Sequence, residues 1–201
     1  MTEQLKSPYW IQTYTKGTYD FYYNNPDDIN IVDIAHSLAQ KPRFGGHLNY
    51  QFSIAQHSLM VAAVMERVGL SNGSKKYPKK VLLQALMHDA HEAYIPDFTR
   101  PFDAYLKEVC NFDVTPIKQQ IDVAISERFG IDLINKHPDI DKFDDYVMRT
   151  EAEDLWDRVV NEWTDSIDQR CKDRILRENI IPFPTAKMLF IKTFKRYGGK
   201  V

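Results

Sequence analysis

The chain has 201 residues, of which 43% are hydrophobic and 12% aromatic, and this composition supports one sizeable core in a single domain over residues 1–201. A formal net charge of -2 at pH 7 gives no sign of nucleic-acid binding, which needs an excess of Lys and Arg. We expect no membrane association, since no apolar run approaches the roughly 18 residues of a membrane span and no signal peptide is recognisable. Cys110 and Cys171 are expected to be reduced thiols of a cytoplasmic protein.

Helical patterns dominate the chain, and the N-terminal part is the exception. Residues 10–25, rich in Tyr and Thr, are predicted to form a short hairpin or an ordered arm. Asp27 or Asp28 is predicted to cap a helix that runs to about Gln40. The stretch 42–46 is predicted to be a loop.

The later segments follow helical spacing with recognisable end signals. Ser53 followed by Gln56 has the form of a capping box that opens a helix. Four more helices are expected further along the chain, and proline and glycine mark several of their ends. The first begins near Pro78 and the second lies between Thr115-Pro116 and Gly130. The third covers 139–156, and the last covers about 185–196, after Pro182 and Pro184. The sequence therefore predicts an all-α bundle with at most a small N-terminal β appendage.

Residues 85–94, ALMHDAHEAY, place His88, Asp89 and Glu92 inside a stretch that is otherwise typical of a buried helix. On a helix these side chains would lie on or near one face. Burying an imidazole and two carboxylates without partners would cost several kcal/mol, so the segment needs a metal or a hydrogen-bond network. We favour the metal, because a second matching segment lies upstream.

That upstream segment carries His57 in the first turns of an apolar helix. A third segment, 139–156, supplies Asp144 or Asp145 ahead of an apolar pair. Two imidazoles and two carboxylates from three helices would form a mixed nitrogen and oxygen site for a first-row divalent metal.

Four motifs in a fixed order give the sequence a family resemblance. They are DIAHSLAQKPRFGGH at 33–47, FSIAQHS at 52–58, ALMHDAHEAY at 85–94, and Phe143-Asp144 ahead of Thr150-Glu151. Together they resemble the HD-domain metal-dependent phosphohydrolases, in particular the nucleotidase branch of bacterial and prophage 5'-deoxynucleotidases and phage deoxyadenosine triphosphate triphosphohydrolases. The resemblance runs from about residue 10 to about residue 160.

The resemblance implies that His57, His88, Asp89 and Asp144 bind one divalent transition metal, which the ligand types allow to be Mn, Fe, Co, Ni or Zn. Asp144 is preferred to Asp145 because it keeps the family's spacing to the Thr-Glu pair.

The resemblance also implies roles around the metal. Glu92 matches an acidic residue that acts on the attacking water or the leaving group, and Arg43 matches an arginine that binds the substrate phosphate. A triphosphate substrate would call for several cationic groups, or for a second divalent ion with Glu92 and Asp97 among its ligands. His91 is a candidate substrate contact, with an exposed turn residue as its plain alternative.

One position departs from the family pattern. Where relatives have a lysine that reaches the phosphates, this chain has Asp103. Arg100 or Lys107 would have to supply the lost positive charge, since a phosphate needs charge-assisted donors.

These features predict a nucleotide phosphohydrolase that acts on deoxynucleoside 5'-monophosphates. The alternatives are a deoxynucleoside triphosphate triphosphohydrolase and a nucleotide-binding module without turnover. Relatives of this kind form dimers or larger rings, so the resemblance also implies a homo-oligomer whose only other partner is a small nucleotide.

Overall fold

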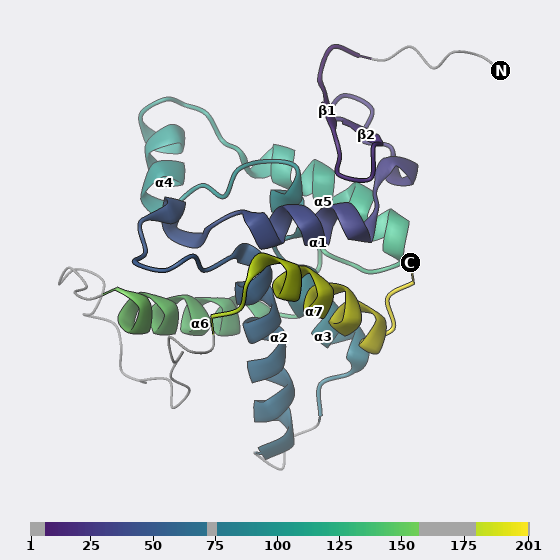
Figure 1. Cartoon of the computed structure of the whole chain (residues 1–201). Helices are drawn as coiled ribbons and strands as arrows, with labels where there is room; N and C mark the ends of the chain where they lie inside the picture. The colour runs from purple at the N-terminus through teal and green to yellow at the C-terminus, as the bar shows by residue number, and fades with distance from the viewer. Residues whose placement is uncertain (1–6, 72–75, 157–179, 201) are drawn as a thin grey trace.

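The computed structural model describes residues 7–71, 76–156 and 180–200. Within these ranges it contains seven α-helices, three 3-10 helices and one two-stranded sheet, arranged as a helical bundle with a small β appendage (Figure 1). The elements in chain order are β1 Trp10–Gln12, β2 Thr18–Asp20, η1 Pro26–Asp28, α1 Ile31–Gln40, η2 Arg43–Gly46, α2 Ile54–Ser71, α3 Lys79–Met87, η3 Ala90–Ala93, α4 Arg100–Glu108, α5 Thr115–Phe129, α6 Asp139–Leu155 and α7 Phe183–Arg196. The predicted fold class is confirmed.

The N-terminal elements occur in the predicted order, but α1 begins later than expected. β1 and β2 pair antiparallel as the predicted hairpin. The predicted cap is wrong, because Asp27 and Asp28 lie in η1 and Ile29 then returns to an extended conformation. Asn30 caps α1 instead, since its side-chain oxygen accepts the Val32 N–H and so satisfies a donor that the helix leaves unpaired.

Three later helices have the predicted end signals. Ser53 Oγ accepts the Gln56 N–H at the start of α2. α5 carries Pro116 in its first turn and ends at Phe129, and Gly130 follows it with a φ of 65°, the left-handed conformation that glycine adopts easily. α6 matches the predicted 139–156 to within one residue.

The core lies where α1, α2, α3 and α7 meet, and α7 brings the far end of the chain back onto it (Figure 1). Phe190 and Phe194 of α7 are fully buried there. This helix begins at Phe183, earlier than predicted. Pro184 falls in its first turn, where the missing N–H would have no helical partner anyway.

Residues 85–94 are not one helix, contrary to the prediction. α3 ends at Met87, Asp89 has φ -104° and ψ 19°, and η3 follows. Asp is one of the residues that favour turns over helix interiors, because its short polar side chain competes for local backbone groups. The turn therefore separates His88 from η3, and the two do not share one helical face.

Two further expectations concern membrane association and the two cysteines. In the part of the chain that the structure describes, no helix has both the length and the apolar character needed to span a membrane. Cys110 is a free, exposed thiol, whereas Cys171 lies outside the described residues.

Candidate metal centre

Two buried imidazoles and two carboxylates meet at the junction of α2, α3 and α6. His57 comes from the first turn of α2, and His88 and Asp89 follow α3 directly. Asp144 comes from α6 and lies with its Oδ1 atom 3.0 Å from His57 Nε2 and 3.7 Å from His88 Nε2. Asp89 Oδ2 completes the group, 3.1 Å from His88 Nε2 and 3.7 Å from His57 Nε2. We call these four residues the His-Asp cluster.

The second nitrogen of each ring fixes which nitrogen faces the cluster. His88 Nδ1 lies 2.8 Å from the Ala85 carbonyl oxygen, which can only accept, so Nδ1 donates. His57 Nδ1 lies 2.7 Å from Glu151 Oε1. A carboxylate oxygen also only accepts, so His57 Nδ1 donates as well. In the neutral rings both Nε2 lone pairs therefore point into the cluster.

The Nε2 atoms of His57 and His88 lack a hydrogen-bond partner of good geometry among the described residues. A buried polar atom without a partner is rare and calls for an explanation. Two imidazole nitrogens and two carboxylates around one point suit a divalent cation, and histidine ligands are commonly held from behind by a carboxylate or a backbone carbonyl. These residues could therefore hold a metal ion.

Without a metal the cluster carries compensating charges. Burial alone would lower the pKa of His88, but Asp89 and Asp144 outweigh it and raise that pKa to about 10. Burial likewise opposes ionisation of the two carboxyls, yet the neighbouring imidazoliums hold the pKa of Asp89 and of Asp144 well below the ordinary range. A cation bound here would take over the charge that the imidazoliums supply.

The alternative ligand Asp145 lies outside the cluster. Its Oδ1 atom is 2.8 Å from Arg100 Nη1 and its Oδ2 atom is 2.8 Å from Arg149 Nε. Successive helical positions point about 100° apart, so only Asp144 faces the two imidazoles.

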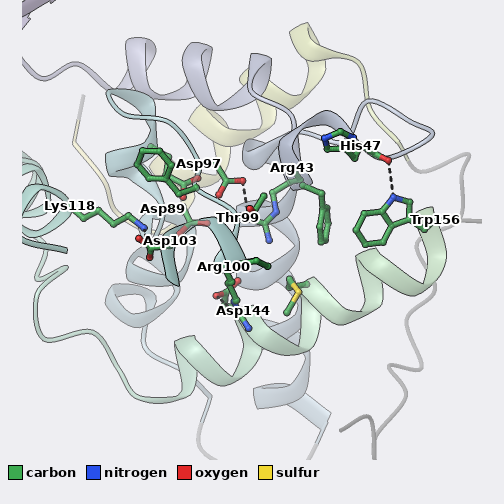
Figure 2. Close-up of a pocket in the computed structure, with 15 residues that line it drawn as sticks. Arg43, His47, Asp89, Asp97, Thr99, Arg100, Asp103, Lys118, Asp144 and Trp156 are labelled. Carbon is green, nitrogen blue, oxygen red and sulfur yellow. Dashed lines mark hydrogen bonds and ion pairs between the residues drawn. The ribbon is translucent and has the colours of Figure 1, made fainter. Parts of the chain in front are cut away.

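A cavity of about 440 Å³ lies beside the cluster, with Asp89 and Asp144 in its wall (Figure 2). The other predicted site residues that line it are Arg43, Glu92, Asp97 and Arg100. His91 does not line this cavity: it is buried against α5, with its Nδ1 atom 3.1 Å from Asp122 Oδ1.

Arg43 is held beside the cluster by two carboxylates. It opens η2, where Phe44 and Gly45 adopt positive φ values of 54° and 61°, and this sharp turn directs the chain along the cavity. Its Nε atom lies 3.4 Å from Glu151 Oε2 and its Nη1 atom 3.7 Å from Asp97 Oδ2. Glu151 is fully buried and so connects Arg43 with His57 of the cluster.

Glu92 is buried in η3, where a carboxylate is unfavourable. Burial, followed by the nearby charges of Asp89 and Asp97, raises the pKa of Glu92 well above its ordinary value. The backbone of η3 is fixed by Lys41, whose Nζ atom donates to the carbonyl oxygens of Glu92 and Ile95. The surroundings of Glu92 therefore favour its protonated form more than those of an ordinary glutamate do.

No role was predicted from the sequence for Glu151, Lys41 or Lys118, although the structure places Glu151 behind His57, Lys41 against the backbone of Glu92, and Lys118 in the wall of the cavity. Glu151 had a signal, because it falls midway between the buried Val147 and Leu155 at helical spacing and a charge on such a face needs a reason. No sequence pattern pointed to Lys41 or Lys118, because their positions at the site depend on how distant segments pack.

The two candidates for the lost lysine lie in different places. Lys107 is 3.2 Å from Asp113 and is not among the residues that line the cavity. Arg100 lines the cavity but is bound to Asp145.

Comparison with known proteins places the chain in a family. The uncharacterized protein YfdR of Escherichia coli K12 is 36% identical to it over 138 residues, which is 67% of this chain and 67% of YfdR. The chain belongs to the YfdR family. The uncharacterized protein RCAP_rcc00048 of Rhodobacter capsulatus is 29% identical to it over 151 residues, 73% of this chain and 72% of that protein. No family model matches, so the function of this YfdR-family chain has to be argued from its site.

Proposed function

We propose that this protein is a metal-dependent phosphohydrolase of the HD-domain type that releases phosphate from deoxynucleoside 5'-monophosphates. The observation that carries the proposal is the convergence of two imidazole nitrogens, which lack a well-oriented hydrogen-bond partner, with two carboxylates beside a cavity that is also lined by Arg43. The choice of deoxynucleotides rests on the resemblance of the four sequence motifs to the nucleotidase branch.

The His-Asp cluster would hold the metal, and Mn, Fe, Co, Ni or Zn all suit its donor set. When bound, the ion would supply Lewis acidity and lower the pKa of the attacking water towards neutrality. The remaining tasks, which are binding the phosphate, moving a proton and holding the nucleoside, belong to side chains around the cavity.

Arg43 would bind the phosphate. Its guanidinium has five N–H donors in a rigid fork, and its contacts with Glu151 and Asp97 are long, at 3.4 and 3.7 Å. Donors therefore remain for a phosphate oxygen, while the two carboxylates keep the fork in place. Charge that develops on the phosphate oxygens during attack would be stabilised by this fixed cation.

Glu92 would move the proton. Burial and the neighbouring carboxylates raise the pKa of Glu92 above its ordinary value, which favours its acid form, so it could donate a proton to the leaving 5'-oxygen and afterwards accept a proton from water.

An aromatic pair gives the nucleobase a place. Phe44 and Trp156 both line the cavity, with ring centroids 5.0 Å apart. The Trp156 indole N–H donates to the His47 carbonyl oxygen at 2.8 Å (Figure 2), which orients the ring. Base stacking on aromatic side chains accepts any base, so this wall favours a nucleotide over a small sugar phosphate.

A second candidate is the triphosphohydrolase. It is favoured by the three cationic side chains in the wall of the cavity, Arg43, Arg100 and Lys118, since a triphosphate needs several cationic partners. A panel of deoxynucleoside mono-, di- and triphosphates, incubated with each candidate metal and resolved by product, separates the two. Phosphate release from monophosphates supports the first proposal, tripolyphosphate release supports the second, and no turnover with any metal contradicts both.

The cluster itself is tested by a matched pair of variants. Asp144→Ala should lose bound metal and activity together, because it removes a ligand. Asp145→Ala removes a carboxylate from the adjacent residue and should keep the wild-type metal content. Elemental analysis that finds equal metal in both variants would show that the ligand set is wrong.

A further inference from the structure

The cavity has two chemically different ends, with the His-Asp cluster between them. Figure 2 shows Trp156 on one side of Asp144 and Lys118 on the other, with Asp103 between Lys118 and Asp89. The first end is aromatic, because Phe44 packs near Trp156. The second is ionic, and it is formed where α4 and α5 contribute one charged side chain each.

The ionic end consists of Lys118 and Asp103, whose Nζ and Oδ2 atoms lie 3.9 Å apart. The Lys118 side chain is 22% exposed and the Asp103 side chain 37% exposed, so both remain accessible from the cavity that they line. This is the longest ion pair formed by a cation of the cavity wall among the described residues. At this distance Asp103 acts on the charge of Lys118 and does not take up its N–H donors.

Substrate orientation gives this pair a function. If the base lies at the aromatic end and the phosphorus lies beside the cluster, then a second phosphate would extend towards Lys118. Lys118 alone would attract it as a strong donor. Asp103 offsets the charge of that amine and places its own negative charge at this end of the cavity, so the two effects act against the same ligand.

We propose that the Lys118–Asp103 pair selects substrates with a single phosphate, by denying a second phosphate the cationic contact that Lys118 would offer at that end of the cavity. The inference rests on the proposed function. It assigns Asp103 a role in excluding nucleoside diphosphates and triphosphates, and it assigns Lys118 the affinity for them that Asp103 suppresses.

The test compares mono- and diphosphate ligands in Asp103→Asn, which removes the charge and keeps the size. The ratio of kcat/KM for a deoxynucleoside diphosphate to that for the monophosphate should rise about tenfold or more, the scale of one charge-assisted hydrogen bond. The double variant Asp103→Asn/Lys118→Met should lose this gain. Asp113→Asn is the matched control, because it removes the carboxylate of another Lys-Asp pair, with Lys107, outside the cavity and should leave the ratio unchanged.

A binding measurement decides the inference independently of turnover. Calorimetry with methylenediphosphonate and methylphosphonate, at a fixed metal concentration, should show the same tenfold rise of the affinity ratio in Asp103→Asn. Chelation of metal by the probe is common to wild type and variant and cancels in the comparison. An unchanged affinity ratio, or a wild-type preference for diphosphates or triphosphates, overturns the inference. A wild type without nucleotide turnover overturns the proposed function instead, and the affinity ratio then still decides the role of Asp103.

Discussion

The charge state of the His-Asp cluster depends on whether a cation is bound. In the metal-free protein the carboxylates raise the pKa of His88 from 6.5 to about 10, so this imidazole is protonated at pH 7. A raised pKa means that the ion pairs contribute their full stability below about pH 6.5 and lose it as the pH rises towards 10. A metal binds the neutral ring and must displace that proton.

Metal binding should therefore release at least about one proton per ion at pH 7.5. The number is measured by calorimetric titration of the metal-free protein in two buffers with different ionisation enthalpies. Asp145→Ala should release the same number, since its carboxylate lies outside the cluster. A binding enthalpy that is independent of the buffer would contradict a protonated His88 in the metal-free cluster.

Glu92 separates chemistry from metal binding. Glu92→Gln should keep the metal but lose at least about 100-fold in turnover, the scale of a missing general acid or base. Metal content and steady-state kinetics of the same preparation provide the check. Turnover close to wild type would leave Glu92 with a structural role only.

Glu92→Gln should increase the stability of the protein, although it should lower turnover. The fold raises the pKa of Glu92, so the folded state holds the proton more tightly, and stability falls as the pH rises above the ordinary glutamic acid range. Gln carries no such cost. The metal-free variant should therefore be more stable than wild type at pH 7, and its advantage should shrink as the pH is lowered.

At the scale of the elements, periodicity predicted most helices, whereas the turn within the site escaped it. The segments around His57 and Asp144 follow helical spacing up to their ends, so their helices could be placed closely. The segment 85–94 is equally apolar, but the chain turns at Asp89, and hydrophobic spacing does not reveal a turn between two buried stretches. The candidate ligands were nevertheless recognisable, because charged groups in apolar surroundings stand out.

Contacts between distant elements could not be predicted from one sequence. Lys118 reaches the cavity only because α5 packs beside η3, and nothing in its local sequence distinguishes it from a surface lysine. Asp103 was recognised as a departure from the family pattern, but its partner depends on that packing.

α6 contributes to the site twice from one face, through Asp144 in the cluster and, about two turns later, through Glu151 behind it. Glu151→Gln removes the charge that holds His57 and Arg43 in place. The metal affinity should fall about 10- to 100-fold, as is usual for residues that orient a metal ligand. Competition with a chelator measures the affinity, and the exposed Glu153 on the same helix supplies a control, Glu153→Gln, that should not change it.

At the scale of the whole molecule, the C-terminal segment holds the helix that carries His57. Gln56 directly precedes His57 in the sequence, and its Oε1 atom accepts a hydrogen bond from the Ile181 N–H at 3.1 Å. Further along α2, Arg196 Nη2 lies 2.9 Å from Glu66 Oε2. α2 is thus fixed at two points by residues that contribute no ligand.

Phe190→Ala should therefore destabilise the protein by about 3–5 kcal/mol, the cost of truncating a buried phenylalanine, because Phe190 is fully buried in α7. Met188→Ala, on the same helix at a residue that is 58% exposed, should change stability by no more than about 0.5 kcal/mol. Denaturant unfolding with and without metal measures both. The stabilisation gained on adding metal should be equal in the two variants, since it depends only on the metal concentration and the affinity of the folded state. A smaller gain in Phe190→Ala would mean that α7 also shapes the metal centre itself, through its contacts with α2.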